Sequence, residues 1–190
     1  ILTFIIKRLI EITGIVVSFL GILLLIALIS YSPNDPNFIF PDNLEINNLL
    51  GFRGSYISDL FFQSVGLISY FISITFIFTG FSIFKNKSFF LFIENIFYTI
   101  PYCLIGSLFF SYFYNDTFKL YISGNGGFVG NYLNQNFLNN FINSNESISY
   151  FLLIILIIFF FLLSVNFKPK NFYLFLKNLF LSIYNKKDKN

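Results

Sequence analysis

The stretch ITGIVVSFLGILLLIALISY, residues 12–31, decides the fold because it runs for 20 residues without a charge. An α-helix rises about 1.5 Å per residue and the hydrocarbon core of a bilayer is about 30 Å thick, so about 20 apolar residues cross it. Three further uncharged, apolar stretches follow at residues 60–84, 95–114 and 147–167. The sequence therefore predicts an all-α membrane protein, a bundle of four transmembrane helices.

The composition supports a membrane protein and argues against several kinds of chemical site. Hydrophobic residues make up 56% of the 190 residues and charged residues only 11%, which is too little charge to cover a soluble globule of this size. The chain has no histidine and a single cysteine, Cys103, inside the third stretch. It cannot form an intrachain disulfide, and we expect no metal site, no cofactor and no catalytic residue.

Positive charge predicts how the four spans are oriented. Of the 12 lysines and arginines, all but Arg53 and Lys119 lie before the first span, between the second and third spans, or after the fourth. Loops rich in Lys and Arg stay in the cytoplasm. We therefore expect both termini inside (N-in/C-in), and the loops at residues 32–59 and 115–146 outside.

The C-terminal residues differ from the rest of the chain. We interpret residues 1–167 as the membrane domain and residues 168–190 as a basic juxtamembrane segment. In this segment apolar residues recur at helical spacing beside lysines, over a length too short to span a bilayer. It is expected to lie on the inner leaflet as an amphipathic segment and to begin a linker to something longer.

The first outer loop opens with a proline-rich turn. Tyr31, Ser32, Pro33, Asp35 and Pro36 directly follow the first span. The two prolines fix φ and disfavour helix in the residues before them, so this turn ends the helix sharply. Its role is either to terminate the helix or to bind a partner during assembly.

A second pattern stands just before the second span. Gly51 and Gly54 flank Arg53 there, and both glycines permit tight or positive-φ backbone. Ser55 is a candidate cap for the helix that follows. Asp59 is a candidate ion-pair partner for Arg53, although an exposed pair would contribute only about 0–1 kcal/mol.

The second outer loop contains SGNGGFVG at residues 123–130, with glycines at Gly126, Gly127 and Gly130. The pattern lacks the lysine and the spacing of a phosphate-binding loop. We interpret it as a flexible turn that leads into an amphipathic segment at residues 132–142. That segment either lies along the outer headgroup layer or packs against the bundle.

A few residues inside the spans are predicted to shape the bundle. Gly14, Ser18 and Gly21, at spacings of four and three, form a face of small residues that favours close helix contact. Glu94 lies shallowly in the third span, where it either pairs with Lys87 or Lys85, extends to the membrane surface, or takes part in a proton relay.

The order of these patterns resembles that in the N-terminal four-helix membrane domain of FtsK-type bacterial DNA translocases. The matching elements are RLIEI at 8–12, SYSPNDP at 30–36, LGFRGSY at 50–56 with Asp59 after it, and GGFVG at 126–130. The SYSPNDP turn is the most specific of them. The resemblance covers nearly the whole chain.

This resemblance implies an anchor and division-site domain in the bacterial inner membrane, joined by a linker to a cytoplasmic motor. In the family the motor is a hexameric ATPase that moves double-stranded DNA during chromosome segregation. The implied partners are other copies of the chain, up to a hexamer, and membrane proteins of the divisome, whereas DNA would be contacted only through the motor. Two alternatives stay open, a free-standing divisome scaffold and a small transporter or channel.

Overall fold

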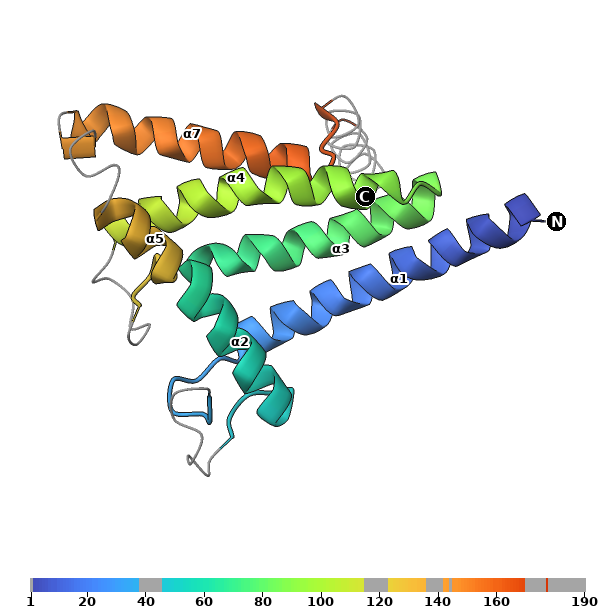
Figure 1. The fold of residues 1–190 in the computed structure, drawn as a ribbon, viewed down its shortest axis with the longest axis horizontal. Coiled ribbons are helices and arrows are strands. Elements are labelled where there is room, and N and C mark those ends of the chain that lie inside the picture. The colour runs from blue at the N-terminus through green and yellow to red at the C-terminus, as the bar shows by residue number, and fades with distance from the viewer. Residues whose placement is uncertain are drawn as a thin grey trace, which may run out of the picture.

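The computed structural model describes residues 2–37, 46–114, 123–135, 142–143, 145–169 and 177, and the described residues contain helices and no strand. In chain order the elements are α1 (Leu2–Ile29), α2 (Gly51–Val65), the 3₁₀ turn η1 (Gly66–Ile68), α3 (Ser69–Asn86), α4 (Phe90–Phe113), α5 (Gly127–Leu133) and α7 (Glu146–Ser164). Figure 1 shows them as a bundle with α2 and α5 at one end. The all-α prediction is confirmed.

Four helical segments are long and apolar enough to cross a membrane. They are Leu2–Ile29, Gly51–Asn86, Phe90–Phe113 and Glu146–Ser164. Large apolar side chains on their outer faces are exposed, for example Phe151 in α7, which is 65% exposed. Such faces would be unfavourable in water and are expected against lipid. The prediction of four membrane-spanning segments is confirmed.

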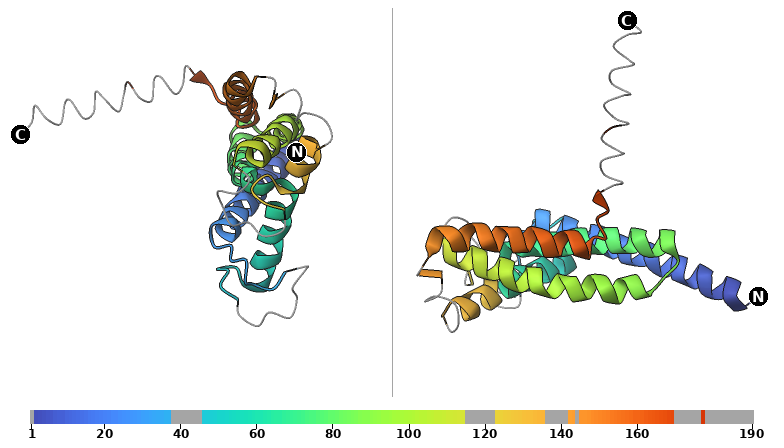
Figure 2. Two further views of the ribbon diagram at one scale, coloured as in Figure 1. Left: turned by 90° about the vertical axis from the view of Figure 1, so that its left-hand side faces the viewer. Right: turned by 90° about the horizontal axis from the view of Figure 1, so that it is seen from above.

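The helices run alternately up and down, so the connections gather at two ends (Figures 1 and 2). We call one end the basic end, because it carries the start of α1 with Lys7 and Arg8, the turn with Lys85 and Lys87, and Lys168 after α7. The opposite, loop end carries α2, α5 and the described residues between α1 and α2, 30–37 and 46–50. The sequence predicts that the basic end faces the cytoplasm, and this orientation stays a prediction.

Helix α1 packs along α3 through glycines on both helices. A Cβ built on Gly14 would lie 2.8 Å from the carbonyl oxygen of Gly80, and one built on Gly21 would lie 2.7 Å from the amide nitrogen of Ile77. The Ser18 hydroxyl donates a hydrogen bond of 3.1 Å to the Ile77 carbonyl oxygen. The small-residue face predicted in the first span is therefore the seam of the α1–α3 pair.

Polar side chains link the other helices within an otherwise apolar bundle. The hydroxyl oxygen of Tyr102 in α4 is 2.9 Å from that of Thr75 in α3, which is 3.0 Å from the Ser164 hydroxyl at the end of α7. All three side chains are buried. Because lipid offers no hydrogen-bonding partner, these groups satisfy one another across the helices.

A second polar link lies closer to the basic end. The Asn95 amide nitrogen donates to the Thr79 hydroxyl at 2.8 Å, and the Asn95 carbonyl oxygen accepts from the Asn166 amide nitrogen at 2.6 Å. Asn166 follows α7 with φ of 53°, in the left-handed region that Asn tolerates better than most residues. This link fixes the end of α7 to α4. The sequence analysis did not single out these residues.

Lys87, one of the two candidate partners of Glu94, pairs with Glu11 instead. The Lys87 Nζ lies 2.9 Å from the Glu11 carboxylate, which also accepts a hydrogen bond from Arg8. Close packing of α1 on α3 brings Glu11 to the turn after α3, and the left-handed Lys87 closes that turn. The proposed amphipathic segment at 168–190 lies almost entirely outside the described residues.

Candidate functional site

The turn after α1 is closed by the buried carboxylate of Asp35, which is 2% exposed. Its oxygens accept hydrogen bonds from the backbone N–H groups of Asn47 at 2.9 Å and Asn48 at 2.8 Å, and from the Asn47 side-chain amide at 3.1 Å. The Asp35 N–H donates to the Ser32 carbonyl at 3.2 Å, across Pro33. One carboxylate thus joins the end of α1 to the approach of α2.

Asn48 completes this connection from the other side. Its amide nitrogen donates to the carbonyl oxygens of Ala27 at 2.9 Å and Ser30 at 3.3 Å, in the last turn of α1 and just after it. The last carbonyl groups of a helix have no hydrogen-bond partner within the helix, and leaving such groups unpaired in a membrane costs free energy. Asn48 supplies a hydrogen bond to two carbonyl groups at the end of α1. Its own side-chain oxygen accepts from the Leu50 N–H at 3.1 Å.

The two glycines at the start of α2 serve different purposes. Gly51 has φ of +65°, and a Cβ there would meet nothing within 4 Å, so the backbone conformation alone favours glycine. Gly54 is in the helix, but a Cβ there would lie 2.1 Å from the Asn48 side-chain oxygen. Gly54 therefore leaves the space in which Asn48 sits.

Ser55 does not cap α2, because the helix begins four residues earlier, at Gly51. Its buried hydroxyl instead donates to the carbonyl oxygen of Pro36. The prediction of a cap at Ser55 is wrong because the positive φ of Gly51 already turns the chain into the helix. The contact joins the proline turn directly to α2.

Asp59 pairs with a tyrosine and not with Arg53, which corrects the second prediction for this segment. The Tyr31 hydroxyl donates to the Asp59 carboxylate at 3.2 Å, and Asp59 is 2% exposed. The ring of Tyr31 packs on Phe62 with centroids 4.8 Å apart. Arg53 lies on a different face of α2, beside an apolar groove. The predicted motifs at 31–36 and 51–59 therefore form one hydrogen-bonded connection.

The third predicted motif lies at the other end of α2, where the second span is broken. Gly66 has φ of +70°, and a Cβ there would lie 1.9 Å from the carbonyl oxygen of Asn125, which accepts the Leu67 N–H at 2.9 Å. Gly127, with φ of +65°, would meet the Gly66 nitrogen at 2.6 Å. The two loops approach so closely that only glycine fits on both sides. The sequence analysis did not foresee the break at Gly66.

Gly126 and Gly130 hold α5 against α4. A Cβ on either glycine would lie within 2.5 Å of the Ser107 carbonyl oxygen, at 2.5 Å and 2.2 Å respectively. The Ser107 hydroxyl donates to the Val65 carbonyl at 2.8 Å. These glycines make a close-packed joint in place of the flexible turn that we expected. Residues 136–141 of the predicted amphipathic segment lie outside the described residues, and Ile142 is buried in the core.

The loop end is thus a rigid cap in which α2 joins two tight connections. Asp35 and Asn48 bind the chain's own backbone there, whereas Ile46, Leu49 and Phe52 are exposed around it. Leu49 is 76% exposed. Over the described part of the chain, no three His, Cys, Asp or Glu side chains are grouped as metal ligands would be.

A bundle of four membrane-spanning helices, joined at one end by hydrogen bonds of Asp35 and Asn48 and by close glycine contacts, defines a multi-pass membrane domain. Residues 6–172 match the family described as the 4TM region of DNA translocase FtsK/SpoIIIE. The chain belongs to this family, which confirms the resemblance seen in the sequence motifs.

One relative is a protein named DNA translocase FtsK from Azospirillum brasilense. It is 30% identical over 87 residues, which cover 45% of this chain and 14% of that protein. The match therefore involves only a small part of the relative's length. No solved structure matches the chain.

Proposed function

We propose that the chain is the membrane anchor and division-site region of an FtsK-type DNA translocase in the bacterial inner membrane. The family match over residues 6–172 carries this proposal. The motor that hydrolyses ATP and moves DNA would be a separate domain, and this segment would hold it at the septum. No residue of this segment is assigned a catalytic role.

At the loop end, we assign different roles to the buried and the exposed residues. Asp35 and Asp59 are each 2% exposed, so they stabilise the cap and are not available to a partner. Leu49 and Phe52 stand outside it, at the end of the bundle where divisome membrane proteins would be met. Exposed apolar side chains of this kind are typical of contact sites.

The described bundle gives less support to a transporter or channel. Such a protein needs a polar path through the membrane, often at broken helices. Among the described helices, the break at Gly66 is closed by contact with Asn125 and Gly127. Within the described spans Tyr102 and Asn95 bind polar groups of neighbouring helices.

Further copies of the chain, up to the hexamer of the family, would associate through the apolar outer faces.

Localisation and mass test the proposal together. In the source cells, an antibody against residues 37–50 should detect a protein several times larger than the 22.2 kDa of this chain. A fluorescent fusion should gather at division septa. A native band near 22 kDa would leave no room for a motor and would favour a free-standing scaffold.

A variant with Leu49→Ser and Phe52→Ser separates recruitment from folding. We expect it to insert normally and to lose its septal localisation, because only exposed side chains are changed. A matched control is Ile148→Ser with Phe151→Ser, two exposed residues on α7. Septal localisation unchanged in the first variant, or lost equally in both, would contradict recruitment through the loop end.

A further inference from the structure

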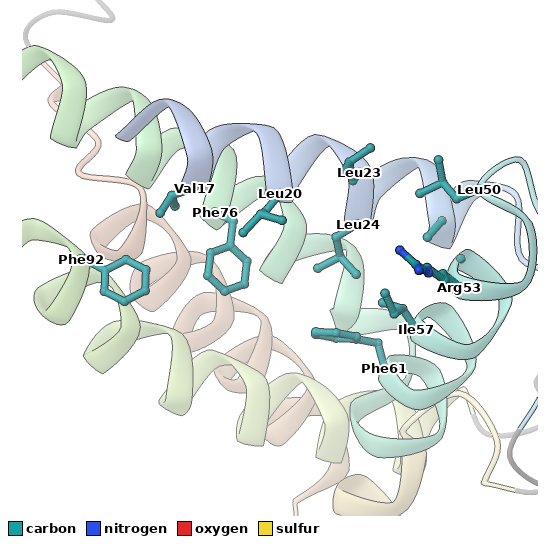
Figure 3. A pocket seen from close by; sticks show the side chains of 12 residues that line it. Val17, Leu20, Leu23, Leu24, Leu50, Arg53, Ile57, Phe61, Phe76 and Phe92 are labelled. Carbon is teal, nitrogen blue, oxygen red and sulfur yellow. The ribbon is translucent and has the colours of Figure 1, made fainter. Parts of the chain in front are cut away.

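A groove of about 500 Å³ opens between α1, α2 and the start of α4. Its walls are apolar, with Val17, Leu20 and Leu24 from α1 and Ile57 and Phe61 from α2. Figure 3 shows these side chains between Phe92 on one side and Arg53 on the other. The volume lies within the range of about 300–1,000 Å³ typical of ligand sites.

The groove has one charged residue, and that charge is at the loop end. Arg53 lines it beside Leu50, near the start of α2 (Figure 3). Both ion pairs among the described residues lie at the basic end, and no described acidic side chain pairs with Arg53. The nearby Asp59 is buried and bound to Tyr31. The guanidinium is therefore available to an anion, and Arg suits a phosphate.

The length of the groove matches one leaflet of a bilayer. Along α1 it is lined from Val17 to Ala27, and the rise between these two residues is about 15 Å of helix. This is half of a hydrocarbon core of about 30 Å. A chain that enters beside Arg53 would therefore reach from the membrane surface to about the middle of the bilayer.

We infer that this groove binds an anionic phospholipid from the leaflet at the loop end. One acyl chain lies along α1 over Leu24, Leu20 and Val17, and the phosphate contacts Arg53. The apolar walls exclude a polar ligand, and the single cation at the surface favours a negatively charged headgroup. A transmembrane helix of a partner or a second copy would fill the groove equally well but would leave Arg53 without an anion.

Native mass spectrometry of the purified, delipidated 190-residue chain in detergent tests this inference. Phosphatidylglycerol and phosphatidylcholine with identical acyl chains serve as the anionic and zwitterionic probes. We expect the wild type to bind phosphatidylglycerol about fivefold more tightly, the preference that one arginine near a membrane surface provides. Equal binding of the two lipids would overturn the proposal.

Two pairs of variants separate the headgroup contact from the chain contact. Arg53→Gln should remove the preference, whereas Lys85→Gln, with the same net charge, should retain it. Leu20→Trp should weaken binding of both lipids by filling the groove, whereas Ile12→Trp, an exposed position on α1 outside the groove, should not. Helix content measured by circular dichroism confirms that each variant is folded.

Two outcomes of these comparisons would contradict the inference. If Arg53→Gln and Lys85→Gln lower the preference equally, the effect is one of net charge and the headgroup site does not exist. If Leu20→Trp leaves lipid binding intact but abolishes self-association, the groove holds a second copy of the chain in place of lipid.

Discussion

Gly80 of α3 lies against the backbone of Ser18 in α1, so closely that a Cβ on Gly80 would stand 2.3 Å from the Ser18 amide nitrogen. Because both contacting groups belong to helix backbones, a clash here could be relieved only by shifting a whole helix. At this point the seam leaves no room for a Cβ atom on Gly80. Close approach of this kind is a main source of attraction between helices in lipid, where the hydrophobic effect no longer favours association.

Gly80→Ala should lower the free energy of unfolding, by about 1–3 kcal/mol, because the added methyl group forces α1 away from α3. Gly106→Ala is the matched control. Its Cβ would meet the buried Ile68 side chain, 2.5 Å from Cδ1 and 2.7 Å from Cγ1, and no backbone atom of another helix, so we expect a smaller loss than for Gly80→Ala. Both changes gain the same helix propensity, about 1 kcal/mol. Unfolding in mixed micelles measures the difference, and equal stability of the two variants would contradict the packing argument.

Asp35→Asn should destabilise the loop end by about 1–3 kcal/mol. The carboxylate accepts three hydrogen bonds from Asn47 and Asn48. An amide offers one acceptor oxygen and places an N–H donor against another donor. Thermal unfolding in detergent measures the loss. Glu146→Gln, an exposed acidic residue at the start of α7, should change stability by no more than about 1 kcal/mol.

The link between Asn95 and Asn166 should be measurable as a coupling between the two residues. We expect Asn95→Ala and Asn166→Gly each to lower stability, and the double variant to lose less than the sum. Asn166→Gly keeps the left-handed backbone and removes only the amide. Hydrogen bonds between membrane helices contribute about 0.6 kcal/mol on average and up to about 1.7 kcal/mol. Strict additivity in a double-mutant cycle would show that the contact contributes nothing.

Orientation can be tested with single cysteines, because the native Cys103 is buried and is replaced by alanine for this purpose. Leu49→Cys at the loop end should react with a membrane-impermeant maleimide in intact spheroplasts. Asn86→Cys at the basic end should react only after permeabilisation. The reverse pattern would mean that both termini face outward, against the distribution of positive charge.

The features predicted correctly from the sequence are those that depend on one segment at a time. The presence of four spans follows from runs of apolar residues, and the seam of α1 was visible as Gly14, Ser18 and Gly21. Its counterpart Gly80 was not, because a lone glycine in an apolar run shows no spacing. The family was identified from the order of several short motifs along the chain. That order is informative even where each motif alone is weak.

Contacts between distant segments were predicted poorly. Lys87 and Lys85 were the candidate partners of Glu94, whereas packing of α1 on α3 brings Glu11 to Lys87. Asn48 and Asn95 lie among many asparagines in an Asn-rich chain, so nothing in the sequence distinguished them. Each asparagine matters because its amide group faces a particular carbonyl or hydroxyl group. The arrangement of the helices determines which group that is.

The pairing of helices has a consequence for synthesis at the membrane. Helix α1 packs on α3, and both lie within the first 86 residues, whereas α7 packs mainly on α4. Because the ribosome synthesises a chain from its N-terminus onward, α1 and α3 can pack through their glycines before α4 and α7 have left the ribosome. The later helices then dock through Tyr102 and Asn95 onto α3, a surface that is already assembled.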